Sequence, residues 1–180
     1  AGNGKDYVTF PIVRNEHRNN ILHMTIAPAE VSEDVAKEAH ELALRLAQGF
    51  ELAGILAIEL FVTKDEQVIV NELAPRPHNS GHYTIEACSF DQFDAHIRGI
   101  AGWPLEQPEL LKPAVMVNVL GQHVAPTRAL IAEHPEWNMH DYCKAEVRHD
   151  RKMGHITVLT DDTRQTVADL ERTGCWDDLK

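Results

Sequence analysis

Two glutamates that interrupt apolar segments are the first residues whose type and spacing suggest chemistry. Glu59 lies within the run Ile-Leu-Ala-Ile-Glu-Leu-Phe-Val, and Glu72 lies near the end of Val-Ile-Val-Asn-Glu-Leu. A hairpin with a symmetric turn over 64–67 places Glu59 directly opposite Glu72. The same register places Leu60 opposite Asn71. Like charges at directly opposed positions destabilise a sheet, so the pair indicates something other than a contribution to stability.

A divalent cation would reverse the sign of this interaction. Mg²⁺ takes oxygen ligands and is commonly held by one or two carboxylates together with substrate phosphates. The spacing therefore indicates a magnesium site formed by Glu59 and Glu72, with the amide oxygen of Asn71 beside them. The alternative is a pair of solvated glutamates on an exposed sheet face, and these residues alone leave both interpretations open.

The loop after Glu72 carries groups that bind anions. Two prolines stiffen it, and a guanidinium suits a carboxylate or a phosphate. A zinc site at His78 and His82 would need a helix to bring residues four apart to one face, which the prolines and the glycine disfavour. A structural turn is the remaining alternative to an oxyanion pocket. The residues predicted for that pocket are Arg76, His78, Asn79, Ser80 and Gly81.

Positive charge gathers near the C-terminal end of an acidic chain. The net charge is −11, which argues against broad nucleic-acid or anionic-membrane surfaces. A charge run is most simply a solvated face. Three well-separated cysteines indicate reduced thiols, and no apolar run approaches the roughly 20 residues that span a bilayer. The basic cluster consists of Lys144, Arg148, Arg151, Lys152 and His155.

The patterns predict both helices and strands, including a hairpin, as in an α+β fold. A proline-rich segment over 103–113 predicts a linker, with a domain boundary near residue 105. Before it, the patterns predict strands over 7–14 and 21–26, a helix capped by Ser32 and running to Phe50, a hairpin of 54–63 with 68–73, and a helix in one or two pieces over 83–100. After it, they predict strands over 114–120 and 155–160 and helices over 127–134 and 163–173.

The segment NELAPRPHNSGHYTIEAC at 71–88 resembles the signature of the N5-carboxyaminoimidazole ribonucleotide synthetase family. The resemblance extends from about Tyr7 to Thr160 and includes the strand 58–63 and the motifs KAEVR at 144–148 and RKMGH at 151–155. It implies the C-terminal half of an ATP-grasp domain for 1–105, with a mostly antiparallel sheet and packed helices. For 106–180 it implies a small β-rich domain.

The resemblance also implies a two-step reaction of purine biosynthesis. ATP phosphorylates bicarbonate to carboxyphosphate, and the carboxyl group then passes to the amine of 5-aminoimidazole ribonucleotide. Magnesium held by Glu59, Glu72 and Asn71 would bridge the ATP phosphates. Carried over residue by residue, the catalytic set is Arg76, His78 and Asn79, and the substrate-binding set is Ser80, Gly81, Lys144 and Arg151, the last two for the 5′-phosphate of the ribonucleotide.

This sequence departs from the family pattern at 149–150, where His149 and Asp150 replace the usual Pro-Gly, and at Tyr83, where Trp is common. The family's phosphate lid and adenine-contacting segment lie upstream of these motifs. We therefore expect a cytoplasmic fragment, inactive alone, whose partners are ATP, bicarbonate, the ribonucleotide, the N-terminal half of the same polypeptide and a second copy in a homodimer. The alternatives are another ATP-grasp ligase of purine metabolism, such as a formate-dependent glycinamide ribonucleotide transformylase, and a non-catalytic interaction module.

Overall fold

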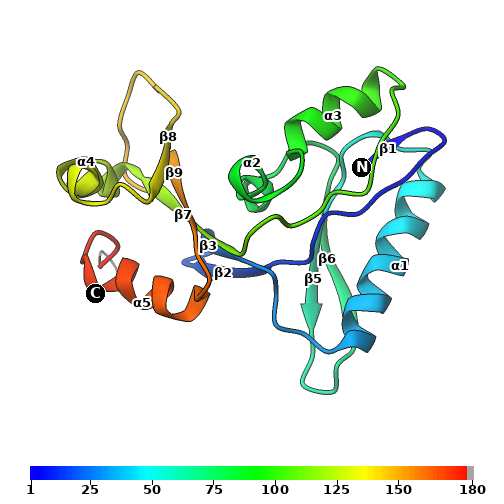
Figure 1. Ribbon diagram of the computed structural model, residues 1–180, viewed down its shortest axis with the longest axis horizontal. Helices are drawn as coiled ribbons and strands as arrows, with labels where there is room; N and C mark the ends of the chain where they lie inside the picture. The colour runs from blue at the N-terminus through cyan, green and yellow to red at the C-terminus, as the bar shows by residue number, and fades with distance from the viewer. Residues whose placement is uncertain (178–180) are drawn as a thin grey trace. The chain divides into compact units, whose positions relative to one another are not determined.

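The two units of the structure are not simply successive segments of the chain, because one hairpin from the N-terminal part belongs to the second unit (Figure 1). The computed structural model describes residues 1–177. The first unit contains Ala1–Ile12 and Ala29–Leu111, and the second contains Val13–Pro28 and the chain from Lys112 onward. Residues 13–28 thus pack with the C-terminal unit, and a division into functional domains at residue 105 remains a prediction.

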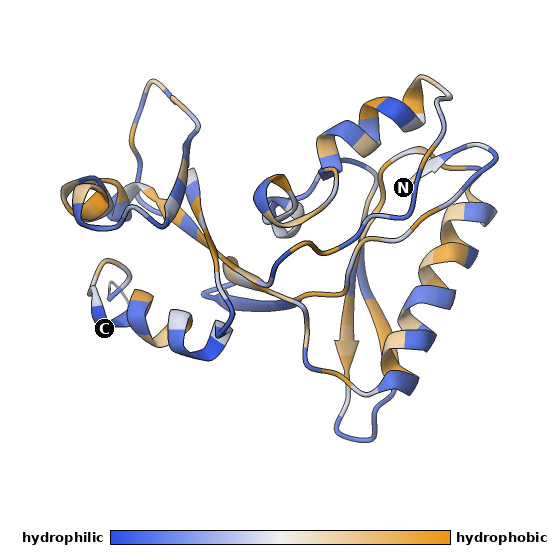
Figure 2. Cartoon of the chain, viewed as in Figure 1, coloured by the Kyte–Doolittle hydropathy of each residue, from blue (hydrophilic) through white to orange (hydrophobic). Residues whose placement is uncertain are grey.

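The longest helix of the first unit is α1 (Glu33–Gly49). It begins where expected, because the Ser32 hydroxyl accepts a hydrogen bond from the backbone N–H of Val35 at 3.3 Å and so caps the first turn. Its buried residues include Val35, Ala39 and Ala47. Figure 2 shows hydrophilic and hydrophobic residues alternating along this helix. Its apolar side packs against the hairpin that carries the two glutamates.

That hairpin consists of β5 (Ala57–Val62) and β6 (Val68–Ala74), paired antiparallel as predicted. The predicted helix over 83–100 forms in two pieces, α2 (Thr84–Ala87) and α3 (Gln92–Ile100). Asp91 separates them because its carboxylate caps α3, accepting hydrogen bonds from the backbone N–H groups of Phe93 and Asp94. Three short elements complete the unit: β1 (Gly2–Asn3), β4 (Ala53–Gly54) and a 3₁₀ turn at Asn79–Gly81.

The second unit is built on a five-stranded antiparallel sheet with the strand order β2-β3-β7-β9-β8. Its strands are β2 (Arg14–Arg18), β3 (Ile21–Ala27), β7 (Ala114–Leu120), β8 (Trp137–Asp141) and β9 (Lys152–Leu159). Its helices are α4 (Val124–Leu130) and α5 (Thr163–Arg172). Two 3₁₀ turns flank α4, at Gly121–His123 and Ile131–Glu133.

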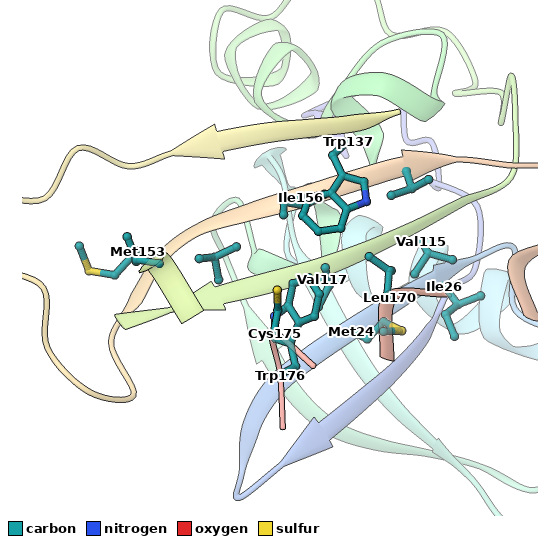
Figure 3. Close-up of a cluster of buried hydrophobic side chains, with 13 residues drawn as sticks. Met24, Ile26, Val115, Val117, Trp137, Met153, Ile156, Leu170, Cys175 and Trp176 are labelled. Atoms are coloured by element: carbon teal, nitrogen blue, oxygen red, sulfur yellow. The ribbon is translucent and has the colours of Figure 1, made fainter. Parts of the chain in front are cut away.

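Alternate residues of the central strands form the core of this unit (Figure 3). Val115, Val117 and Val119 point to one side of β7, as period-two alternation requires. Leu170 of α5 and Trp176 pack against them, and the indole N–H of Trp176 donates to the carbonyl of residue 118 at 2.9 Å. This packing fixes the register of β7 and β9, on which the basic C-terminal loop depends.

Three expected elements are corrected by the structure. The strand predicted over 7–14 is wrong: the ladder of β2 begins only at Arg14 and continues to Arg18. Asn19 and Asn20 both have positive φ, 49° and 61°, and make a tight hairpin turn instead of a six-residue loop. Strand β8 was not anticipated because most of its residues are polar, and the helix predicted over 127–134 begins earlier, at Val124.

Both units combine helices with antiparallel strands, which confirms the predicted α+β class. Within residues 1–177, no helix has the length and apolar character needed to cross a bilayer.

Candidate active site

Glu59 and Glu72 are register partners on β5 and β6, as the spacing predicts. The ladder is irregular immediately after Glu59, however, and Leu60 pairs with Val70 rather than with Asn71. Asn71 is therefore the extra residue of a β-bulge. Its side-chain amide nitrogen lies 3.3 Å from Glu59 Oε2 and donates a hydrogen bond to it. The bulge thus adds the amide to the carboxylate pair.

The two carboxylates have different surroundings. The Glu59 side chain is 16% exposed, and its Oε1 lies 3.9 Å from Nε2 of His78. Glu72 is exposed. Within residues 1–177, no set of three or more His, Cys, Asp or Glu side chains is arranged to hold a metal ion. A cation at Glu59 and Glu72 would therefore take further oxygen ligands from Asn71, from water or from phosphates, which is the donor set that magnesium commonly has.

The loop after β6 is held by its own hydrogen bonds. His78 precedes the 3₁₀ turn at Asn79–Gly81, and its Nδ1 accepts from the backbone N–H of Ser80 at 3.4 Å. The Ser80 hydroxyl lies 2.8 Å from the same nitrogen. These contacts assign the ring proton to Nε2, which is the nitrogen nearer Glu59. The imidazole is thereby oriented between the turn and the carboxylate pair.

Two other loop residues have spare donors. The Arg76 side chain is exposed, and its Nη1 donates to the carbonyl oxygen of Pro77 at 3.1 Å; within residues 1–177 its other N–H groups have no acceptor. The side-chain amide nitrogen of Asn79 is buried and has no hydrogen-bond partner within the described part of the chain. A buried donor without an acceptor is costly, and an anionic ligand would satisfy it.

The connection from β8 to β9 carries Lys144, Arg148 and Arg151 of the basic cluster, whereas Lys152 and His155 lie in β9. Nζ of Lys144 donates to the carbonyl oxygen of Lys152 at 2.5 Å and lies 5.5 Å from the centre of the Tyr142 ring. Arg151 is exposed, and its Nη1 donates to the carbonyl oxygen of Glu146 at 3.2 Å. Both cations are therefore held by the backbone of one loop.

Asp150 takes a conformation usually given to glycine, with φ at 59°. Gln122 holds it from both ends: Nε2 donates to the Asp150 carboxylate at 2.9 Å, and Oε1 accepts from the Asp150 N–H at 2.9 Å. The other carboxylate oxygen lies 3.2 Å from Nδ1 of His149. These contacts explain how the loop tolerates an aspartate where the resembling family usually has glycine.

Burial controls the pKa of two neighbouring groups in the first unit. Burial raises the pKa of the Cys88 thiol to about 11. Burial is also the main cause that raises the pKa of the Tyr83 hydroxyl, and the neighbouring Cys88 raises it further. The Tyr83 hydroxyl donates to the carbonyl oxygen of Pro11 at 3.1 Å. Both groups stay neutral at physiological pH, and both are buried at the ends of α2.

A family model of the ATP-grasp domain matches residues 2–93, just over half of the 180 residues. The chain belongs to the ATP-grasp family. A second family model, the phosphoribosylaminoimidazole carboxylase C-terminal domain, matches residues 114–169. The ATP-grasp match includes the glutamate pair and the His78 loop, and the second match includes Lys144 and Arg151.

Relatives of this ATP-grasp chain carry the name inferred from its motifs. The N5-carboxyaminoimidazole ribonucleotide synthase of Staphylococcus aureus (strain COL) is 48% identical over 170 residues, covering 94% of this chain and 45% of the relative. A solved N5-carboxyaminoimidazole synthetase from Staphylococcus aureus complexed with ADP has a TM-score of 0.90 and 46% identity, covering 97% of this chain and 48% of that one.

A third relative was solved with a nucleotide and a ribonucleotide. The N5-carboxyaminoimidazole synthase from Aspergillus clavatus, in complex with ADP and 5-aminoimidazole ribonucleotide, has a TM-score of 0.85 and 32% identity, covering 92% of this chain and 46% of that one. The chain thus spans less than half the length of these relatives. The comparisons confirm the resemblance to the N5-carboxyaminoimidazole ribonucleotide synthetase family.

The first unit brings part of the predicted set together. Glu59 is the register partner of Glu72 and contacts Asn71 and His78, whereas Lys144 and Arg151 belong to the second unit. Sequence reasoning missed Gln92, which is buried and bonded to the His78 backbone. The sequence signal for Gln92 was its place directly after the helix cap Asp91, in the first turn of α3, where its side chain is buried.

Proposed function

We propose that this chain is the C-terminal part of an N5-carboxyaminoimidazole ribonucleotide synthetase. That enzyme carboxylates 5-aminoimidazole ribonucleotide with bicarbonate at the expense of ATP. The observation that carries the proposal is the bulged hairpin, which joins Glu59, Glu72 and Asn71 beside the His78 ring. The names of the relatives, and the ligands named for them, support the same assignment.

Magnesium fits the hairpin by the chemistry of its donors. Two carboxylates on adjacent strands would hold it, with the Asn71 side chain able to contribute an amide oxygen after rotation. When bound, the ion would neutralise the charge of the nucleotide phosphates. Cation binding would give Glu59 and Glu72 a role. Without a cation, two opposed carboxylates would only destabilise the hairpin.

The His78 loop supplies fixed donors for the anion that reacts. Arg76 has guanidinium N–H groups without an acceptor in the described part of the chain, and these suit a carboxylate or phosphate. The buried Asn79 amide nitrogen lacks an acceptor among the described residues, and the ring N–H of His78 adds a third donor. Donors set in advance around bicarbonate and carboxyphosphate stabilise the charge that develops on phosphoryl transfer. Ser80 holds the imidazole. The close approach that Gly81 permits is taken by the Gln92 side-chain amide, so Gly81 supports the loop rather than leaving space there for a ligand.

Lys144 and Arg151 would bind the 5′-phosphate of the ribonucleotide. Each side chain now donates to a backbone carbonyl of its own loop, and a phosphate would accept stronger, charge-assisted bonds. The remaining parts of the assignment rest on the family resemblance: an N-terminal half that supplies the rest of the nucleotide site, assembly as a homodimer, and a cytoplasmic location. Another ATP-grasp ligase would share the glutamate pair but not the second family match.

The test is ATP turnover by the full-length protein, meaning this chain joined to the half that the relatives possess. We expect turnover that requires magnesium, bicarbonate and 5-aminoimidazole ribonucleotide together. Turnover that instead follows formate and glycinamide ribonucleotide would assign a different ligase. A folded full-length protein that neither binds nor hydrolyses Mg-ATP would support the non-catalytic module.

A further inference from the structure

Gln92 is a buried polar residue that contacts the His78 loop from the first turn of α3. Its side chain is among the most buried polar groups of the unit, at 3% exposure. Oε1 accepts from the backbone N–H of His78 at 2.9 Å, and Nε2 donates to the carbonyl oxygen of the same residue at 2.8 Å. The Gln92 amide therefore forms hydrogen bonds with both the backbone N–H and the backbone carbonyl of His78, whose ring lies near Glu59.

This pair of bonds fixes the orientation of the Gln92 amide. The backbone N–H of His78 can only donate, so the atom facing it must be oxygen, and the carbonyl must face the NH₂ group. Nε2 is then also 2.9 Å from Nδ1 of His82. Since an amide nitrogen donates, Nδ1 of His82 accepts and its ring proton lies on Nε2. The amide thus links two histidines of the loop.

The neighbouring atoms leave the amide little freedom. A Cβ on Gly81 would overlap the Gln92 side-chain amide, so glycine is needed where the turn crosses it. Thr84 donates from its hydroxyl to the carbonyl oxygen of Gly81 at 2.6 Å and accepts from the backbone N–H of Gln92 at 3.0 Å. The ring of His82 stacks on Phe93, the next residue of α3, with centroids 5.6 Å apart. The start of α3 and the turn are therefore interlocked.

We infer that Gln92 is the positioning residue of the reactive loop, setting where the His78 ring and the Asn79 amide meet the carboxyl group of bicarbonate. This inference rests on the proposed function. Gln92 touches no reacting atom and acts through the His78 backbone. Donors that stabilise a developing charge must be held near their working geometry, because a displacement of about 1 Å can cost roughly 100-fold in rate. The loop after β6 lies outside the β5–β6 ladder, and the buried Gln92 amide supplies hydrogen bonds to the His78 backbone in its place.

The test uses Gln92→Glu in the full-length enzyme, with Gln92→Met as a second variant. Glutamate keeps the size and the acceptor but cannot donate from a carboxylate, and it sets negative charge against the His78 carbonyl. Methionine keeps the volume and removes both bonds. We expect either variant to lower kcat for ribonucleotide carboxylation by about 10- to 100-fold, while KM for ATP changes less than about twofold. Gln48→Glu, at an exposed position of α1, makes the same chemical change and should leave kcat unaltered.

The second readout does not depend on activity. Nitrogen NMR of the imidazoles in the wild-type full-length enzyme should show His82 neutral with its proton on Nε2. A proton on Nδ1 would overturn the inference even if both variants failed to fold. Folded variants with wild-type kcat would overturn it as well. If the wild-type enzyme shows the predicted tautomer but no bicarbonate-dependent turnover, the proposed function is refuted and the hydrogen-bonded arrangement of the loop still stands.

Discussion

The Asn71 side chain donates a hydrogen bond to Glu59 across the hairpin, with 3.3 Å between Nδ2 and Oε2. Strict alternation along β6 would turn Asn71 away from the face that Glu72 occupies. The bulge after Glu59 removes that constraint, and the ladder continues one residue out of step at Leu60 and Val70. Bulges are frequent next to active sites, where they re-aim a side chain. Here the bulge joins an amide to a carboxylate pair.

If this cluster holds magnesium, Glu72→Gln should reduce ATP turnover in the full-length enzyme by roughly 100- to 1,000-fold, as the loss of one preorganised charge-stabilising group commonly does. The physical reason is the loss of one of the two carboxylate charges that would hold the cation. Turnover would be measured over a magnesium titration. Glu41→Gln, at an exposed position of α1, is the matched control. Turnover equal in both variants would remove Glu72 from the metal site.

Arg151→Ala should raise KM for 5-aminoimidazole ribonucleotide by about 10- to 100-fold, since a charge-assisted hydrogen bond contributes roughly 1.5–3 kcal/mol. KM for ATP should stay nearly constant, because the predicted contact is with the ribonucleotide phosphate alone. Steady-state kinetics with each substrate varied in turn would separate the two. Arg172→Ala on α5, an exposed arginine paired with Asp169, provides the control. The opposite pattern, with ATP affinity lost, would assign the basic loop to the nucleotide.

The isolated 180-residue chain should fold but lack catalysis. Each unit has its own buried residues, among them Tyr83 in the first and Trp176 in the second. Circular dichroism during heating should therefore show cooperative unfolding. Bicarbonate-dependent ATP hydrolysis by this chain would contradict the expectation that the nucleotide site needs the other half.

The three thiols should react at different rates. Cys143 is exposed, whereas Cys88 and Cys175 are buried. Burial raises the pKa of Cys88 to about 11, so little thiolate exists at pH 8. Mass spectrometry after brief alkylation at pH 8 should find Cys143 modified and Cys88 protected. Equal labelling of Cys88 in the folded chain would show that α2 opens readily.

The same shift predicts how stability depends on pH. A thiol whose pKa is raised by folding favours the folded state fully below its unfolded pKa, and this contribution is lost as pH rises toward 11. The free energy of unfolding should therefore fall between about pH 9 and pH 11, with Tyr83 contributing in the same direction. Denaturant titrations across this range would measure the slope. Cys88→Ala should flatten it, and an unchanged slope would assign the loss to other groups.

Local sequence determined the elements that rest on local physics. Ser32 caps α1 because its hydroxyl meets an N–H three residues on, and the polar turn between two apolar strands fixed the hairpin and the Glu59–Glu72 pairing. The KAEVR and RKMGH motifs identified the basic cluster, which lies on the connection before β9 and at the start of that strand. In each case the deciding contacts join residues that are near in the chain or follow from simple strand alternation.

Tertiary structure alone decided what depends on packing between distant segments. The exposed side of α3 carries Ile97 and Ile100, at 58% and 59% exposure, although their spacing suggests a core stripe; the buried side carries Gln92. A glutamine is buried there because the His78 backbone, fourteen residues earlier, supplies a partner for each half of its amide. No periodicity in the sequence encodes that pairing, since both bonds exist only after the loop has folded onto the helix.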